Sequence, residues 1–105
     1  MNYLDKLFNL EDKFAVIIGS GGHICSEISI GLNMAGCNLL LLDIRNHKNI
    51  IIKKHMKKIG NINKEILNFK FDANKKNDYL KILDFLKKNK KKIDILINGA
   101  GINSP

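Results

Sequence analysis

The feature that most constrains the fold is the alternation of short apolar segments with segments of helical periodicity. The apolar segments have the length and composition of strands buried on both faces; they span residues 14–18, 38–43, 66–71 and 93–97. The helices predicted between them span residues 24–35, 48–59 and 75–88. Strands joined through helices pair in parallel by right-handed connections. The sequence therefore predicts an α/β fold, a partial Rossmann fold in which four strands of a doubly wound parallel sheet alternate with three helices.

Each predicted helix carries an apolar stripe that we expect to face the sheet. The residues of these stripes are Ile24, Ile28, Gly31, Leu32 and Ala35 in the first helix, Ile51, Ile52, His55, Met56 and Ile59 in the second, and Leu80, Leu83, Phe85 and Leu86 in the third. In this topology further strands follow the fourth. We therefore expect the edge of the fourth strand to be unpaired and available for aggregation.

The length and composition of the chain exclude several classes of protein. Its 105 residues fit one domain, residues 1–105, and 45% hydrophobic with 27% charged residues is ordinary for a globular protein. No apolar run approaches the length of a membrane span, and the first residues lack the apolar core of a signal peptide. We therefore expect a cytoplasmic protein without a membrane partner. Cys25 and Cys37 fall near opposite ends of one predicted helix, so we expect free thiols.

The formal net charge of +8 raises the alternative of a basic nucleic-acid-binding protein. Most of the excess lies in two lysine-rich segments, 53–58 and 87–92, each on a predicted helix or at its C-terminal end. Cations there also interact favourably with the helix dipole. Aromatic residues are few and are not interleaved with the lysines. We interpret these segments as solvated helix faces and expect no nucleic-acid partner.

A glycine-rich turn, residues 19–25 with the sequence GSGGHIC, lies where the first predicted strand leads into the first helix. The first N–H groups of a helix have no internal acceptor, the helix dipole is positive there, and glycines let the backbone approach an anion closely. The turn therefore predicts a phosphate-bearing ligand. It lacks the Lys-Ser/Thr pair of a P-loop, which disfavours nucleoside triphosphate hydrolysis. His23 is interpreted as a residue at the helix start, and no metal is expected.

An acidic residue, Asp43, ends the second predicted strand about 20 residues after the glycine turn. Folds of this class place a carboxylate there against the ribose hydroxyls of an adenosine. Because its charge would repel a 2′-phosphate, Asp43 favours NAD over NADP, although Arg45 could partly accommodate that phosphate. The alternative is that Asp43 only caps a turn.

Together these features resemble the short-chain dehydrogenase/reductase family, which opens with a Thr-Gly-x-x-x-Gly-x-Gly turn after its first strand. Gly19 matches the first glycine of that turn, and Asp72 with Ala73 matches the family's adenine-contacting pair after the third strand. Residues 98–101 (NGAG) resemble the family's Asn-Asn-Ala-Gly motif after the fourth strand. The lead-in and ending are similar to those of D-mannonate oxidoreductase-type sugar-acid reductases.

The resemblance implies the cofactor-binding portion of an oxidoreductase that transfers a hydride between a nicotinamide cofactor and an alcohol or carbonyl substrate, with sugar acids among the candidates. It also implies that the full-length form is a homo-oligomer. The dinucleotide-binding residues expected from the turn, from Asp43 and from the resemblance are Gly19, Ser20, Gly21, Gly22, His23, Ile24, Asp43, Ile44, Asp72, Ala73, Asn98, Gly99, Ala100 and Gly101.

The sequence departs from the family pattern at four positions. Ile18, His23 and Cys25 stand where the turn has its threonine and its last two glycines, and Gly99 stands where the later motif has its second asparagine. The last glycine lets the helix pack close to the strand, so a cysteine there needs extra room. These departures put the tightness of dinucleotide binding in question.

Catalysis in the family uses a serine and a Tyr-x-x-x-Lys pair, in which the lysine lowers the pKa of the tyrosine. Tyr3 and Tyr79 are followed four positions later by Leu7 and Leu83. No catalytic residue is therefore assigned, the catalytic half is expected beyond Pro105, and the chain is expected to be inactive alone. The alternative is a non-catalytic dinucleotide-binding or regulatory module.

Overall fold

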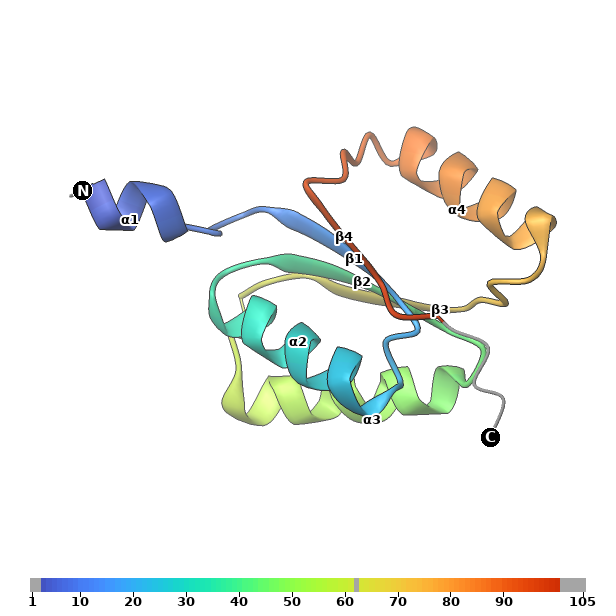
Figure 1. Ribbon diagram of the computed structural model, residues 1–105, viewed down its shortest axis with the longest axis horizontal. Helices are drawn as coiled ribbons and strands as arrows, with labels where there is room; N and C mark the ends of the chain where they lie inside the picture. The colour runs from blue at the N-terminus through green and yellow to red at the C-terminus, as the bar shows by residue number, and fades with distance from the viewer. Residues whose placement is uncertain (1–2, 62, 101–105) are drawn as a thin grey trace.

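The computed structural model describes residues 3–61 and 63–100, which form a four-stranded sheet flanked by helices (Figure 1). The elements in chain order are α1 (Tyr3–Phe8), β1 (Phe14–Ile18), α2 (His23–Met34), β2 (Asn38–Asp43), α3 (Asn46–Ile59), β3 (Ile66–Lys70), α4 (Lys76–Lys88) and β4 (Ile95–Asn98). The strand order is β3-β2-β1-β4, and every pair is parallel. The predicted doubly wound α/β arrangement is confirmed.

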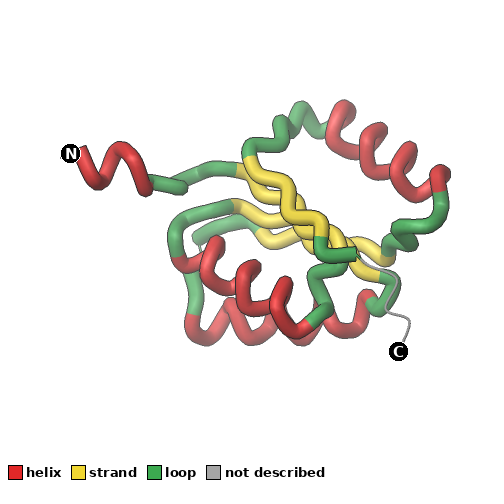
Figure 2. Tube along the Cα trace, viewed as in Figure 1, coloured by secondary structure: helices red, strands yellow, loops and turns green. Residues whose placement is uncertain are grey.

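The helices lie in two layers, one on each side of the sheet. Figure 2 shows the strands in the middle, with α2 and α3 on one side and α4 on the other. β1 and β2 have the predicted bounds, whereas β3 ends one residue earlier and β4 begins two residues later than predicted. The sequence analysis missed α1, which extends away from the sheet with Tyr3 and Phe8 each 74% exposed. Because α1 buries little apolar surface against the sheet, it has no buried stripe that a periodicity could reveal.

The core forms on both faces of β1 and β2. Successive residues of a strand point to opposite faces, so a continuous apolar run supplies two cores. On one face Ala15, Ile17, Leu39 and Leu41 belong to a buried cluster with Ile52 and Met56 of α3. On the other face Phe14, Val16, Ile18, Leu40 and Leu42 pack with Phe71 and Leu86. This double burial explains why the two strands contain almost no polar residue.

The buried face of α2 differs from the prediction. Cys25, Ser29 and Asn33 face the interior, and Leu32 is half-buried. The predicted inward residues that are instead exposed are Ile24, Ile28, Gly31 and Ala35. The buried polar groups are satisfied, because the Ser29 hydroxyl donates to the Cys25 carbonyl at 2.7 Å and the Asn33 amide bonds the backbone of Asn61. Short side chains with internal partners thus replace the apolar stripe.

The predictions for α3 and α4 are partly correct. Ile52 and Met56 are buried as predicted, as is Leu86, and Phe85 packs against the same core as Leu86. The predicted inward residues that are exposed are Ile51, His55, Ile59, Leu80 and Leu83. In α3 the third buried position is a polar residue, Asn49, for which an apolar pattern gives no signal.

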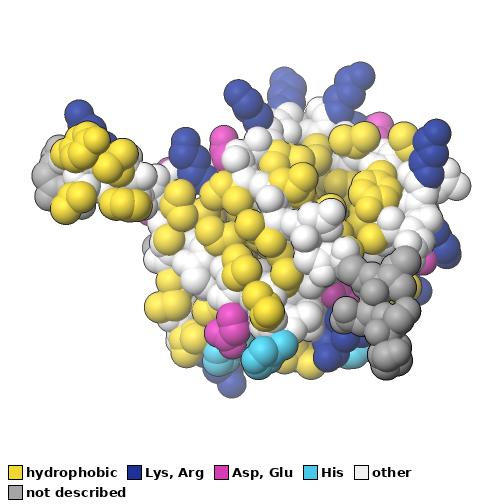
Figure 3. Space-filling model, viewed as in Figure 1, with side chains coloured by type: hydrophobic (Ala, Val, Ile, Leu, Met, Phe, Trp, Pro, Cys, Tyr) yellow, Lys and Arg dark blue, Asp and Glu magenta, His cyan; other side chains and the backbone are white. Residues whose placement is uncertain are grey.

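The edge of the sheet at β4 is unpaired among the described residues, as predicted. Leu96 in this strand is 57% exposed. Figure 3 shows hydrophobic side chains spread over the visible face and over α1, with lysines around its margin. None of the helices within residues 3–61 and 63–100 is both long enough and apolar enough to cross a membrane.

The orientation of α2 can be tested with Ile24→Ala, compared with Met56→Ala in α3 as a buried reference. Met56→Ala should lower the free energy of unfolding by about 2–5 kcal/mol, because the side chain is fully buried. Ile24→Ala should change it by less than about 0.5 kcal/mol, because Ile24 is 72% exposed. Urea unfolding followed by circular dichroism measures both. A loss for Ile24→Ala as large as that for Met56→Ala would contradict the observed face of α2.

Candidate functional site

A crevice opens at the edge of the sheet where the four parallel strands end. Its volume is about 280 Å³. The residues that line it are Ile18, Gly19, Gly22, Asp43, Ile44, Arg45, Phe71, Asp72, Ala73, Asn74, Gly99 and Ala100. In open α/β sheets ligands bind outside the carboxyl ends of the strands, at the point where the strand order reverses. Here that point lies between β1 and β4, whose following residues both reach the crevice.

The crevice brings together many of the residues predicted from the sequence. The predicted residues in its wall are Gly19, Gly22, Asp43, Ile44, Asp72, Ala73, Gly99 and Ala100. The predicted residues outside its wall are Ser20, Gly21, His23, Ile24 and Asn98; Gly101 lies outside the described residues. The wall residues that are not among the predicted binding residues are Ile18, Arg45, Phe71 and Asn74. Each is directly adjacent in the sequence to a predicted residue, so the ends of the predicted strands carried the available signal.

The backbone of the glycine turn leaves hydrogen-bond donors at the start of α2. The Ser26 N–H donates to the Gly22 carbonyl at 2.8 Å, the first bond of the helix, and the Gly22 N–H donates to Gly19. The N–H groups of residues 23–25 therefore have no acceptor within the helix. Together with the positive end of the helix dipole they can receive an anion.

Gly19 is a glycine for two reasons. Its φ of +80° lies in the left-handed region that side chains disfavour. A Cβ atom at Gly19 would also lie 2.9 Å from the backbone of Gly99 and of Ala100. The turn after β1 and the segment after β4 are thus packed backbone to backbone.

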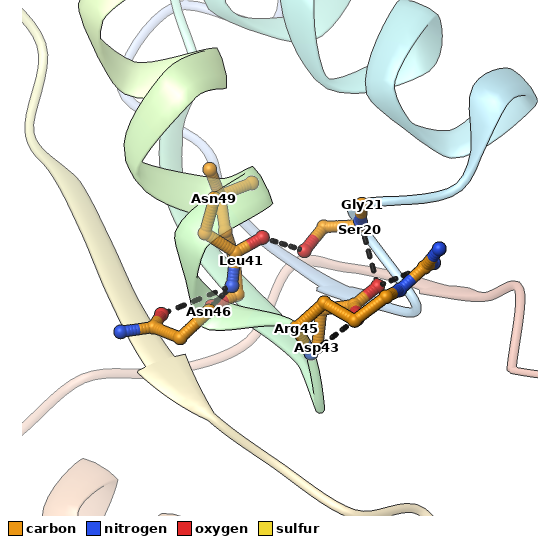
Figure 4. A network of polar contacts seen from close by, with 7 residues as sticks. All are labelled: Ser20, Gly21, Leu41, Asp43, Arg45, Asn46 and Asn49. Carbon is orange, nitrogen blue, oxygen red and sulfur yellow. Dashed lines mark hydrogen bonds and ion pairs between the residues drawn. The ribbon is translucent and has the colours of Figure 1, made fainter.

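The carboxylate of Asp43 is held by the glycine turn on one side and by Arg45 on the other (Figure 4). Its Oδ2 accepts a hydrogen bond from the Gly21 N–H at 2.8 Å, and its Oδ1 accepts from the Arg45 N–H at 2.8 Å. The guanidinium of Arg45 adds a salt bridge at 3.2 Å. Burial would raise the pKa of Asp43, but the hydrogen bonds from Arg45 and Gly21 outweigh it and lower the pKa below its ordinary value. The side chain is therefore a carboxylate at neutral pH.

A second network, with Ser20 and Asn49 buried at its centre, ties the glycine turn to α3. The hydroxyl of Ser20 donates to Oδ1 of Asn49, and the Asn49 amide donates to the Leu41 carbonyl at 3.2 Å and to Asn46 Oδ1 at 3.4 Å (Figure 4). Ser20 and Asn49 are both 0% exposed. The backbone N–H of Ser20 also donates to Leu42 at 3.2 Å. The turn is therefore fixed to the end of β2 through main chain and side chain together.

The other predicted polar residues cap turns at the same edge. Oδ1 of Asp72 accepts from the Asn74 N–H at 2.9 Å, and the Asp72 N–H donates to the carboxylate of Asp78 at 2.8 Å. Oδ1 of Asn98 accepts from the Ala100 N–H at 3.2 Å. These bonds order the loops after β3 and β4, whose residues form the far wall of the crevice.

The lysine-rich segments lie away from one another. One is on α3 and the other on and after α4, and these helices cover opposite faces of the sheet (Figure 1). They do not form one basic surface. No group of three or more histidine, cysteine, aspartate or glutamate side chains in residues 3–61 and 63–100 is placed to hold a metal ion. Cys25 and Cys37 are both buried and free.

Comparisons of the sequence with known proteins identify its relatives. The short chain dehydrogenase family model matches residues 13–105. The chain is 34% identical over 100 residues to an NAD-dependent glycerol dehydrogenase of Listeria innocua, covering 93% of this chain and 36% of that enzyme. It is 31% identical to short-chain dehydrogenase/reductase 1 of Saponaria officinalis, covering 91% of this chain and 32% of that protein. The chain spans about a third of the length of the curated relatives it matches.

Solved structures have the same fold. A Haemophilus influenzae protein assigned as a D-mannonate oxidoreductase, solved with bound NAD, has a TM-score of 0.80 at 27% identity and covers 97% of this chain and 35% of that one. A 7α-hydroxysteroid dehydrogenase with NADH has a TM-score of 0.82 at 27% identity, covering 100% and 40% of the two chains. L-Sorbose reductase of Gluconobacter frateurii, complexed with NADPH, shares the fold with a TM-score of 0.81 at 22% identity. The match covers 92% of this chain and 36% of the reductase.

The network beneath the turn can be tested with Ser20→Ala. The substitution leaves the buried Oδ1 of Asn49 without its donor and should lower the free energy of unfolding by about 1–3 kcal/mol. Ser26→Ala is the matched control, because the Ser26 hydroxyl donates to the His23 carbonyl at an exposed position; it should change the free energy by less than about 0.5 kcal/mol. Chemical unfolding of both variants measures the two changes in the free energy of unfolding. Equal effects would mean that the Ser20–Asn49 contact contributes no stability.

Proposed function

The chain belongs to the short-chain dehydrogenase family, and we propose that it binds NAD in the crevice at the carboxyl ends of its strands. It serves as the cofactor-binding part of an oxidoreductase that transfers a hydride between the nicotinamide and an alcohol or carbonyl substrate. One observation carries this proposal: Gly22, which directly precedes the unpaired N–H groups of α2, and the ionised Asp43 line the same crevice.

The groups around the crevice fit the parts of a dinucleotide. The N–H groups of residues 23–25 can hold the pyrophosphate, because they combine free donors with the positive end of the helix dipole. Asp43 can accept hydrogen bonds from the ribose hydroxyls. Ile44 and Phe71 supply apolar wall on the side of β2 and β3, next to Asp72 and Ala73, where the adenine fits. When bound, NAD supplies the hydride acceptor.

The carboxylate of Asp43 favours NAD over NADP. It is charged, so a ribose that binds against it through its hydroxyls would be disfavoured if its 2′-hydroxyl carried a phosphate. Arg45 neutralises part of this charge, but its side chain is 46% exposed and its contacts with the carboxylate are long, at 3.2 and 3.4 Å. Ribose hydroxyls can therefore replace the guanidinium while the Gly21 and Arg45 N–H groups stay in place. The NAD-dependent relative from Listeria innocua supports the same preference.

The residues of this chain bind and orient the cofactor and do not perform the proton transfer. Neither tyrosine is followed by a lysine four residues later, so the chain alone should show no turnover. A sugar acid is the substrate class that the likeness to the D-mannonate oxidoreductase supports. We infer in addition a homo-oligomeric full-length enzyme, as the family resemblance implies. We also infer a cytoplasmic location, as expected from the sequence.

Titration with NAD and NADP tests the proposal. NAD should bind saturably with weak dependence on salt, and Asp43→Ala should weaken it by roughly 10- to 100-fold, because hydrogen bonds to a charged group contribute about 1.5–3 kcal/mol. Asp84→Ala is the control, since Asp84 is an exposed carboxylate on α4, away from the crevice, that pairs with Lys88. Isothermal titration calorimetry at two salt concentrations measures the affinities. A folded chain that binds neither dinucleotide would refute the proposed function.

A further inference from the structure

Two residues far apart in the sequence compete for one small space beside the glycine turn. A Cβ atom at Gly99 would lie 2.1 Å from the sulfur of Cys25, well inside van der Waals contact. Cys25 lies in the first turn of α2 and is 8% exposed; Gly99 follows β4 directly. In this backbone the thiol already fills the volume that a side chain at position 99 would need.

The backbone around Gly99 leaves little freedom to relieve such a clash. The Gly99 N–H donates to the Ile18 carbonyl at 2.8 Å, and on the other side the Gly99 backbone would be 2.9 Å from a Cβ at Gly19. Gly99 is therefore held between the end of β1 and the turn. Its φ is not positive, unlike that of Gly19. Space beside Cys25, and not backbone conformation, requires glycine at position 99.

Rotation of the thiol gives little relief. A helix allows the Cys25 side chain mainly two χ1 rotamers, so the sulfur has mainly one other position. Cys25 belongs to the buried cluster of Ala15 and Ile17, so a displaced sulfur meets packed core.

We propose that Cys25 and Gly99 form one coupled position, in which the thiol packs behind the part of the crevice wall that Gly99 supplies. The thiol on α2 occupies the space made by the missing side chain after β4, so the crevice stays open although the helix begins without its usual third glycine. Cys25 in place of the turn's last glycine adds side-chain volume on α2, and Gly99 in place of the later motif's second asparagine removes side-chain volume after β4. These two departures from the family pattern therefore compensate each other. This inference rests on the proposed NAD-binding function for its binding readout, whereas its packing part stands without it.

A double-mutant cycle of Gly99→Ala and Cys25→Ala tests the coupling. The Cβ of Cys25 would be 3.6 Å from a Cβ at position 99, an ordinary contact, so Cys25→Ala removes the clash without removing the helix side chain altogether. Gly99→Ala should weaken NAD binding at least about 10-fold and lower the unfolding midpoint. In the Cys25→Ala background the same substitution should have little further effect, so the double variant should match Cys25→Ala within about 3-fold in affinity and in its unfolding midpoint. Calorimetry with NAD and thermal unfolding without it give the two readouts.

Gly31→Ala is the matched control for adding a methyl group. It lies in the same helix as Cys25, and nothing is within 4 Å of a Cβ built there, so it should leave NAD affinity and the unfolding midpoint unchanged or slightly raise the latter. If Gly99→Ala behaves like Gly31→Ala, or if Cys25→Ala fails to rescue it in both readouts, the coupling is overturned. If Cys25→Ala rescues the unfolding midpoint of Gly99→Ala, but neither the unsubstituted chain nor any variant binds NAD, the coupling stands and the proposed function fails.

Discussion

The parallel pairing of β1 with β2 on one side and with β4 on the other is the interaction on which the rest of the structure depends. All five residues of β1 are buried, and they alternate between two cores, one beneath α2 and α3 and one beneath α4. Because the strands run in the same direction, the loops that follow them gather at one edge. The crevice, the free N–H groups of α2 and the loops after β3 and β4 are brought together by this single constraint.

At that edge the same polar groups support the fold and face the crevice. Asp43 accepts the Gly21 N–H that would otherwise be free in the turn, and a Cβ at Gly21 would lie only 2.8 Å from the carboxylate. Asp43 therefore acts as the anchor of the glycine turn as well as the proposed partner of a ribose. The two interpretations of this residue, turn cap and ligand contact, are compatible, since a carboxylate has room for about four acceptor positions.

The buried network of Ser20 and Asn49 has a related role. It replaces apolar packing beneath the turn with directional bonds that reach β2 through the Leu41 carbonyl. Directional bonds fix the position of the turn more closely than apolar contacts can, because they are lost when the geometry shifts. A turn that must hold its N–H groups ready for an anion benefits from such support, since binding then requires little ordering.

The sequence by itself determined the fold class, the bounds of β1 and β2, the glycine turn and the position of Asp43, because continuous apolar runs and glycines at a strand end leave few alternatives. It did not determine which face of α2 is buried, since a stripe of apolar residues does not reveal where the sheet lies. It also gave no sign that Asp43 is bonded to Gly21 and Arg45 or that Asn49 supports Ser20. Only the tertiary structure decided these points and placed Cys25 against Gly99, because they depend on contacts between segments that are distant in the chain and meet only when the parallel strands are paired.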